Sequence, residues 1–444
     1  MLSAIGLLVA VILFIFMVVK GVDMVTSAVV TAVIIILTSG LSLPNGLFDN
    51  FSEGVAGFSV GAAGFVQSWM IILALGGIFG ELVGETGLAV RIAKTLSNIL
   101  GPKNVGLTIM ICVFLITLLG INGYIMVFVL YPIADNMLRE NGMDRRLLPF
   151  LMICGGANAN SFAYSMDVCN VIPTTFLGTG TGVAPGLSVV FSAITCVWYV
   201  LYFNRAQKKS MAENTAEQLQ AMYKNVHEVA SDDELPNIGL SLLPFVLVLV
   251  CVVVMTKCTE FSSTVILAAS LFVGVAVIII TMFGRVKANL KAILKKGSNS
   301  GLSTMLTVAA VVGLSKVLAA SPAFASVQQA VLNLSLPVYF KTWIGTLICG
   351  ALTGSAITAE TLFLDSFGQA FIQQGASAAA LHRICAEAGI TLNKLPNASP
   401  VVMETTVCEC TIAESYMHIV FGSTIPCLIA GFVITLMATM GIII

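Results

Sequence analysis

The sequence has little charge. Of its 444 residues, only 10% are Asp, Glu, Lys or Arg, whereas a soluble globular protein carries about 25%. Its formal net charge of −1 leaves no basic surface for binding nucleic-acid phosphates. This composition excludes a soluble enzyme, a disordered chain and a nucleic-acid-binding protein.

The residues that bind metals or perform catalysis are few and scattered. The three histidines lie at positions 227, 382 and 418, far from one another in sequence. The 11 cysteines lie almost all in apolar segments, where thiols pack as small hydrophobic groups. Neither a Ser-His-Asp set nor an H-E-x-x-H motif is visible. The sequence therefore predicts no catalytic residue, no metal site and no cofactor.

Hydrophobic residues are abundant: they make up 58% of the chain, and the mean hydropathy is +1.00. Apolar runs of about 17–25 residues recur, and each is long enough to cross the bilayer core as a helix. Because these runs do not alternate apolar and polar residues, they predict helices rather than barrel strands. Residues 2–19 lack a basic flank and a visible cleavage site, so they predict a membrane span rather than a signal peptide.

One polar, charged segment, residues 205–236, divides the chain into halves 1–204 and 237–444. Val171-Ile-Pro-Thr-Thr aligns with Val402-Met-Glu-Thr-Thr, and the same register aligns Ile153-Cys154 with Ile384-Cys385. Agreement in both order and spacing predicts an internal duplication.

The basic residues predict that the two halves are inverted. Segment 205–236 is rich in Lys and Arg and is therefore predicted to be cytoplasmic. Two spans, 237–257 and 262–284, then return the chain to a second basic cluster at 285–296. The matching loop of the first half, 41–67, has acidic residues and no Lys or Arg, which indicates the external side. Inverted halves are typical of secondary transporters.

Five basic residues do not fit this topology, and we interpret them as buried or functional. They are Lys257, Lys316, Lys341, Arg383 and Lys394. Glu81 and Glu85 lie one turn apart on a predicted span, near the position that the internal duplication aligns with Lys316. We expect them to pair with it across the halves.

Two regions predict re-entrant hairpins. Residues 103–139 form two short apolar arms joined at 120–123, and residues 341–371 match them, with a tip at 350–361. Free amides and hydroxyls at such tips favour anion binding. Two ordinary short spans joined by a tight external turn remain an alternative.

Two further regions predict broken helices. Residues 155–186 are rich in Gly, Asn, Ser and Thr, and residues 381–414 hold several carboxylates. Polar, non-helical chain at membrane depth is tolerated only where protein or a water-filled cavity surrounds it. The GTGTG run at 178–182 lacks the Lys-Ser/Thr that follows in a phosphate loop.

Three carboxylates are candidates for cation coupling: Asp167, Glu360 and Glu404. A charge in mid-membrane costs about 2.5–3.5 kcal/mol on insertion scales, so such residues usually face a cavity or a partner. Each carboxylate is therefore a candidate to carry H⁺ or to bind Na⁺. A purely structural role remains the alternative for all three.

Several runs resemble one known family. Residues 76–96 are similar to the Gly-rich span found early in the family. Residues 170–179, followed by Ala184-Pro185, are similar to its first polar break. Residues 382–384 and 395–397 are similar to a segment of its second half. Together these runs, spread over nearly the whole chain, resemble the gluconate permease family of the ion transporter superfamily.

The resemblance implies import of sugar acids, hydroxy acids or related organic anions, typically with protons. It also implies a dimer in which a transport domain moves against a scaffold, with one site formed by the hairpin tips and polar breaks. The implied substrate-binding residues are Asn122, Gly123, Asn158, Asn160, Ser161, Thr174, Ser355, Thr358, Asn397 and Thr405. Residues 166–169, 386–389 and 397–399 depart from the family pattern and would border the substrate, so gluconate itself is not implied.

The sequence thus predicts an all-α polytopic membrane protein with two inverted repeats, re-entrant hairpins and broken helices. The leading hypothesis is a homodimeric symporter of the cytoplasmic (inner) membrane that moves a small organic anion with H⁺ or Na⁺. A cation/proton antiporter and a non-transporting membrane subunit are the alternatives.

Overall fold

The computed structural model describes residues 2–20, 22–51, 56–101, 104–118, 123–223, 234–259, 261, 263–396 and 398–444. Within these ranges the chain forms helices, apart from one isolated bridge between Asn50 and Ala56. Five of the described helices are long and apolar enough to cross a membrane: Phe58–Glu85, Pro185–Glu213, Thr264–Thr281, Leu290–Ala320 and Ile412–Thr439. The prediction of an all-α, multi-span membrane protein is confirmed.

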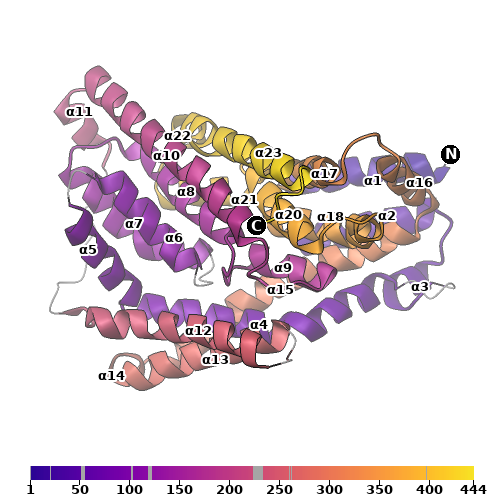
Figure 1. Ribbon diagram of the computed structural model, residues 1–444, viewed down its shortest axis with the longest axis horizontal. Helices are drawn as coiled ribbons and strands as arrows, with labels where there is room; N and C mark the ends of the chain where they lie inside the picture. The colour runs from indigo at the N-terminus through magenta and orange to yellow at the C-terminus, as the bar shows by residue number, and fades with distance from the viewer. Residues whose placement is uncertain are drawn as a thin grey trace.

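The first half of the chain forms α1 to α10 (Figure 1). Their bounds are α1 Leu2–Val19, α2 Met24–Thr38, α3 Leu43–Phe48, α4 Phe58–Glu85, α5 Leu88–Leu100, α6 Val105–Leu118, α7 Gly123–Glu140, η2 Arg145–Leu147, α8 Leu148–Ser161, α9 Val168–Leu177 and α10 Pro185–Glu213. The predicted span 2–19 coincides with α1, but its stretch Ser3–Phe14 belongs to the shorter apolar helices rather than to the five long helices named above. Helix α10 continues to Glu213, so the polar segment predicted from residue 205 begins as part of this helix.

The rest of the chain forms α11 to α23. Their bounds are α11 Ala216–Ala221, α12 Ile238–Cys258, α13 Ser263–Thr281, α14 Phe283–Val286, α15 Leu290–Ala320, α16 Pro322–Leu332, α17 Val338–Thr353, α18 Ala356–Phe363, the π-helical segment η4 Leu364–Gly368, α19 Gln369–Gln373, α20 Ala378–Leu392, α21 Ser399–Val407, α22 Ile412–Ile419, the π-helical segment η5 Val420–Thr424 and α23 Ile425–Thr439. The N-terminus and α11 lie at opposite ends of the molecule (Figure 1).

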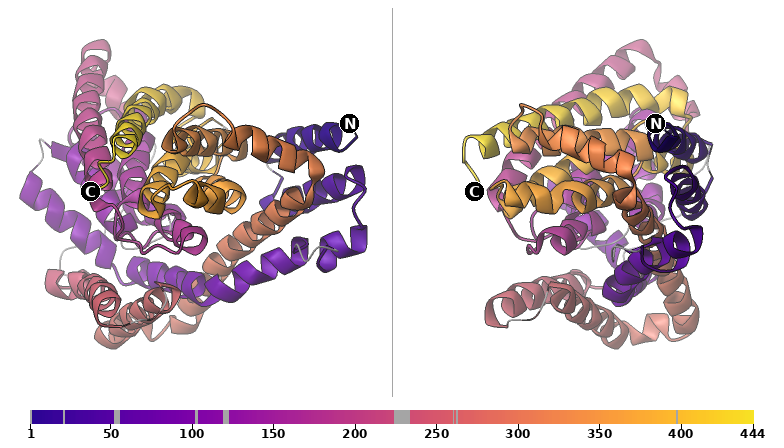
Figure 2. Two further views of the ribbon diagram at one scale, coloured as in Figure 1. Left: turned by 45° about the vertical axis from the view of Figure 1, so that its right-hand side comes forward. Right: turned by 90° about the vertical axis from the view of Figure 1, so that its right-hand side faces the viewer.

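Helices α4 and α15 pack against each other along their length (Figure 2, left). Glycines allow this close approach: a Cβ on Gly77 would lie 2.2 Å from the Gly297 carbonyl oxygen, and one on Gly301 would lie 1.9 Å from the Leu73 carbonyl oxygen. Backbone-to-backbone contact of this kind is how small residues bring membrane helices together.

The ion pairs of α15 correct one prediction. Glu81 pairs with Lys296 at 2.9 Å, and Lys316 pairs instead with Asp365 of η4 at 2.6 Å. The predicted pairing of Glu81 with Lys316 is therefore wrong. Lys316 lies beside Gly61, near the opposite end of α4, because the two helices run antiparallel. Twenty residues of helix separate Lys296 from Lys316 by about 30 Å.

Helices end at both predicted polar breaks. In the first, α8 ends at Ser161, α9 is short, and α10 begins at Pro185. In the second, α20 ends at Leu392, and α21 spans only Ser399–Val407. Gly354, with a φ of 63°, ends α17 and starts the turn into α18. The corresponding link between α6 and α7, residues 119–122, lies outside the described residues.

The polar end of α10 and the described residues that follow it, up to Tyr223, pack onto the turn between α7 and α8. Gln207 Oε1 accepts from the backbone N–H of Asp144 at 3.0 Å, and the Tyr223 hydroxyl donates to the Met143 carbonyl at 2.7 Å. Burial works to raise the pKa of the Asp144 carboxyl, but hydrogen bonds from Arg146 and Ser210 outweigh it and hold that pKa below its ordinary value. This segment is thus fastened to the broken-helix part of the molecule.

Arg145 extends that attachment across the two halves. Its guanidinium donates to Asp135 Oδ1 at 2.8 Å, to the Tyr131 hydroxyl at 2.6 Å and to Glu409 Oε2 at 3.0 Å. It also donates to the Met222 carbonyl at 3.3 Å. One buried side chain therefore joins α7, the turn after α21 and the polar segment.

We predict that Gly77→Ala destabilises the protein. The added methyl group meets backbone atoms that cannot move aside, and overpacking of this kind costs about 1–3 kcal/mol. The thermal unfolding midpoint in detergent, followed by fluorescence-detected size-exclusion chromatography, should fall by several degrees. Gly76→Ala is the matched control, because a Cβ there meets nothing within 4 Å. Equal midpoints for the two variants would show that the helix crossing does not require Gly77.

Candidate functional site

A cavity of about 1000 Å³ lies between helices of both halves. Helices α4, α8 and α9 line it from the first half, and α15, α18 and α21 from the second. The uncharged polar residues in its wall are Thr117, Asn160, Ser300, Ser303, Thr307, Ser355 and Asn393, and its inner charged residues are Asp167, Lys394 and Glu404. Both polar breaks and the turn between α17 and α18 therefore open onto one space.

Helix ends, rather than helix sides, supply much of this polar wall. Asn160 is in the last turn of α8, Asp167 precedes α9, Ser355 precedes α18, and Asn393 follows α20. The start of α18 lies beside the start of α21, because a Cβ on Gly354 would be 3.2 Å from Ala398 Cα. The amino ends of helices carry partial positive charge and free N–H groups, which favours an anion at this place.

The caps of these short helices differ. Asp167 Oδ1 accepts from the Cys169 N–H at 2.9 Å, and Ser355 Oγ accepts from the Thr358 N–H at 3.3 Å. Ala398, at the start of α21, provides no side-chain cap. Among α9, α18 and α21, only α21 begins without a side-chain acceptor for the N–H groups of its first turn.

Arg383 holds the first polar break in place. Its side chain is fully buried. It donates to the Ser161 carbonyl, to Asn170 Oδ1 at 2.9 Å, to the Val183 carbonyl at 2.9 Å and to the Thr181 carbonyl at 3.3 Å. All four acceptors lie between the last residue of α8 and the start of α10. Arg383, predicted to be buried or functional, therefore ties α20 of the second half to the broken helix of the first.

His382 adds a second link between the same elements. Its Nδ1 lies 2.7 Å from Thr179 Oγ1, and its Nε2 lies 3.2 Å from Asn170 Oδ1. The polar residues at 179–181 are thereby occupied by contacts with α20. This explains the GTGTG run as a structural connection to the second half.

Glu387 lies one turn beyond Arg383 on α20. It belongs to the stretch 386–389 that was expected to border the substrate, but it was not among the three predicted coupling carboxylates. Its Oε2 accepts from the Ser161 hydroxyl at 2.5 Å, and its Oε1 has no hydrogen-bond partner among the described residues. The i, i+4 spacing from Arg383 was the available signal, since it places both residues on one helix face. Ser161 therefore faces α20 rather than the cavity.

The three predicted coupling carboxylates lie at different depths. Asp167 and Glu404 line the cavity, whereas Glu360 is fully buried behind the wall. Neither Glu360 oxygen has a hydrogen-bond partner among the described residues. Gly389 provides room for it, because a Cβ there would lie 2.6 Å from Glu360 Oε1.

The predicted substrate-binding residues divide into two groups. Asn160 and Ser355 line the cavity. The others of known position have contacts elsewhere: Asn158 Oδ1 accepts from Thr195 at 2.8 Å, Thr174 donates to the Val171 carbonyl at 2.6 Å, Thr358 donates to Ser355 Oγ at 3.1 Å and Thr405 donates to the Val401 carbonyl at 2.7 Å. Gly123 is the first residue of α7. Asn122 and Asn397 lie outside the described residues.

Sequence reasoning also missed the wall formed by α15. Ser300, Ser303 and Thr307 face the cavity from the helix that crosses α4. Their spacing of three and four residues puts them on one face of a helix. That period was visible in the sequence, but without the fold nothing indicated which surface the face would meet.

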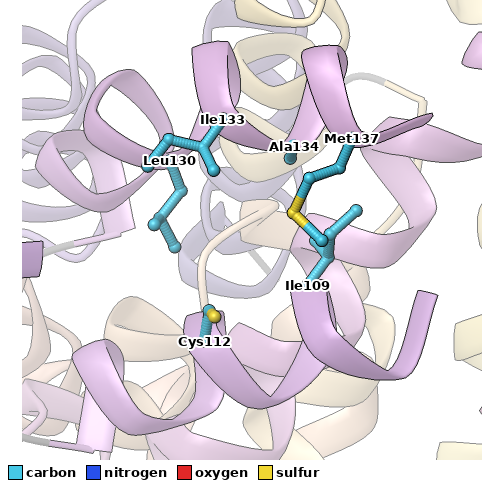
Figure 3. Close-up of a pocket in the computed structure, with 6 residues that line it drawn as sticks. All are labelled: Ile109, Cys112, Leu130, Ile133, Ala134 and Met137. Carbon is cyan, nitrogen blue, oxygen red and sulfur yellow. The ribbon is translucent and has the colours of Figure 1, made fainter. Parts of the chain in front are cut away.

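A second, small gap lies between α6 and α7 (Figure 3). Its volume is about 10 Å³, no more than one water molecule needs. It is lined by Ile109, Cys112, Leu130, Ile133, Ala134 and Met137. With aliphatic chains, one thioether and one thiol around it, this gap offers a polar ligand no partner.

Comparison with known proteins agrees with the sequence resemblance. The family model described as "GntP family permease" matches residues 2–441. An uncharacterized transporter of Bacillus subtilis (strain 168), YxjC, is 25% identical over 398 residues, which are 80% of this chain and 83% of the relative. An uncharacterized permease of Haemophilus influenzae is 27% identical over 262 residues, covering 56% of this chain and 50% of the relative.

We predict that Arg383→Lys strongly destabilises the protein. A single ammonium has three N–H groups and cannot reach all four acceptors of the guanidinium, and each buried acceptor left unpaired costs about 1–3 kcal/mol. The unfolding midpoint should fall by more than that of Arg285→Lys, a substitution at an exposed position. An Arg383→Lys protein as stable as this control would show that the carbonyls of the first break do not depend on the guanidinium.

Proposed function

The chain belongs to the GntP family of permeases, and from this premise we propose that it is a symporter of the cytoplasmic (inner) membrane. Its cargo would be a small organic anion such as a sugar acid, a hydroxy acid or a short carboxylate, and H⁺ or Na⁺ would move with it. The observation that carries this proposal is the cavity of about 1000 Å³ on which helix ends of both halves converge. Its volume suits a small solute.

The donors around the cavity support an anionic cargo. The amino ends of α9, α18 and α21 meet there, and the hydroxyls of Ser300, Ser303 and Thr307 face them from α15. Such groups bind a carboxylate through N–H and O–H donors. Asn160 and Ser355 line the cavity, and we propose that they contact the cargo directly.

The order of elements supports two inverted repeats in 1–204 and 237–444, joined by a cytoplasmic linker at 205–236. A pair of helices, a short helix and a long helix occur as α1 to α4 and again as α12 to α15. The two long helices run antiparallel, since Glu81 pairs near the start of α15 and Gly61 lies near its end. Equivalent helices of inverted repeats have this relation.

The packing supports an elevator-like mechanism. Helices α8, α9, α18, α20 and α21 contact one another, and Arg383 fastens α20 to the first break. Helices α4 and α15 pack against each other on the other side of the cavity, and α15 also contacts α18 and η4. We assign the first group to a transport domain and the second, with α1, α2, α12 and α13, to a scaffold. In a homodimer, the scaffold would be the part that meets its copy.

The coupling cation would bind or protonate Asp167, Glu360 or Glu404. A small anion crosses the bilayer core more easily when a cation cancels its charge. Glu360 and the Oε2 atom of Glu404 have no hydrogen-bond partner among the described residues. They are thus free to accept a proton or contribute to a cation site. The same carboxylates favour the second candidate function, a cation/proton antiporter.

Solute counterflow in proteoliposomes tests the proposal. The panel is labelled gluconate, 3-hydroxybutyrate, lactate, citrate and a dicarboxylate. We expect exchange of at least one anion, blocked by unlabelled excess, because counterflow requires only a carrier and no ion gradient. No exchange with folded protein, combined with cation-driven proton movement in the absence of organic solute, would favour the antiporter.

We predict that Glu360→Gln and Glu404→Gln separate exchange from coupled uptake. Removing the coupling carboxylate should lower gradient-driven uptake by about tenfold or more, which corresponds to about 1.4 kcal/mol. The rate of counterflow should remain unchanged, because counterflow does not use the ion gradient. Separately imposed H⁺ and Na⁺ gradients identify the cation. Glu217→Gln, at an exposed position of α11, is the control. Unchanged gradient-driven uptake in both variants would exclude these two residues from coupling.

A further inference from the structure

Lys394 is a buried cation in the cavity wall. It lies two residues after the end of α20, is only 3% exposed, and belongs to the residues that line the cavity. Its ammonium donates to Ser423 Oγ at 3.0 Å and to Cys427 Sγ at 3.2 Å. Both acceptors are neutral, and none of the ion pairs among the described residues includes Lys394.

This arrangement leaves the ammonium incompletely satisfied. An ammonium has three N–H groups, and only two are engaged here. The Glu387 carboxyl acts on this ammonium only through space, without direct contact. A buried ammonium that has no carboxylate in direct contact is stabilised by a further partner. The other lysine in the cavity wall, Lys20, is exposed at the end of α1, so it does not face the same constraint.

Three polar elements meet at this part of the wall. A Cβ on Gly350 would lie 3.7 Å from the backbone nitrogen of Asn393, and a Cβ on Gly354 would lie 3.2 Å from Ala398 Cα. The turn between α17 and α18, the end of α20 and the uncapped start of α21 are therefore neighbours. Each of them contributes residues to the cavity lining.

Asn393 provides an independent sign that a ligand group belongs here. Its side chain is 7% exposed, and its Oδ1 has no hydrogen-bond partner among the described residues. The oxygen and nitrogen of an amide are assigned by their partners, so a bound carboxylate would turn the NH₂ group toward itself. A carboxylate at this place would meet the Asn393 amide, the first-turn N–H groups of α21 and the third N–H of Lys394.

We propose that Lys394 binds the carboxylate of the transported anion and thereby selects an anionic cargo. Ser423 and Cys427 are positioning residues that hold its ammonium. The proposal rests on the proposed transport function and adds a specific residue to it. Ser423 belongs to the π-helical segment η5, a type of irregularity frequent at functional sites.

Competition in the counterflow assay tests this role. The competitors are the acid that the wild type exchanges, for example gluconate or 3-hydroxybutyrate, and its neutral amide, gluconamide or 3-hydroxybutyramide. We expect the wild type to prefer the acid. Lys394→Gln should raise the half-saturation concentration for the acid by about ten- to a hundredfold, the range of a charge-assisted hydrogen bond. It should also abolish the preference over the amide.

Lys341→Gln is the matched control. Lys341 is buried too, and its ammonium donates to the Leu332 carbonyl at 2.6 Å, but it does not line the cavity. Its substitution should leave both the half-saturation concentration and the preference for the acid unchanged. A loss of stability common to both variants is therefore separated from a loss of anion recognition.

Lys394→Arg keeps the test decisive if the Gln variant does not fold. It retains the positive charge, so the preference for the acid should remain, while the displaced donor raises the half-saturation concentration by about three- to tenfold. Unchanged half-saturation and unchanged acid preference in a folded Lys394 variant would overturn the proposal, whatever its stability, and leave the transport function standing. No exchange of any anion by the wild type would overturn both.

Discussion

The backbone carbonyls of the first polar break must find hydrogen-bond donors inside a protein surrounded by lipid. The rest of the site depends on which side chains supply these donors. No water reaches an unpaired carbonyl in the bilayer core, so each one left unsatisfied costs several kcal/mol. Arg383 supplies donors to three carbonyls and to Asn170 Oδ1 at once. Since it comes from the other half of the chain, the break forms only when both halves are in place.

The glycine contact between α4 and α15 provides the other side of the cavity. Gly77 and Gly301 bring two backbones together, and this contact sets the position of Ser300 and Ser303 in the wall. The contacts of the two helices at this place are between backbone atoms. Under the proposed elevator-like mechanism, this wall would be the surface past which the helices joined by Arg383 move.

Much of the fold follows from the sequence because its causes are local. Apolar runs predicted the spans, and Gly-rich or polar stretches predicted where α8, α17 and α20 end. The pairing of Glu81 with Lys296 was not predictable, because it depends on the register of two helices more than 200 residues apart. Lys394 was one of the basic residues that did not fit the predicted topology, but its position in the cavity wall could not be known without the fold. Asn158 and Thr174 looked equivalent to Asn160 in composition, yet their side chains are used inside the protein.

Charge balance gives a physical reason for coupling under the proposed function. The cavity and the two breaks hold more carboxyl groups than buried cations: Asp167, Glu360, Glu387 and Glu404 against Arg383 and Lys394. In a low-dielectric interior an excess of negative charge is unfavourable, and an entering organic anion adds to it. The anion is therefore accommodated at lower cost when a proton or another cation neutralises one of these carboxylates. Because Glu360 lies behind the wall and Asp167 and Glu404 lie in it, a cation entering from the cavity meets Asp167 or Glu404 before Glu360.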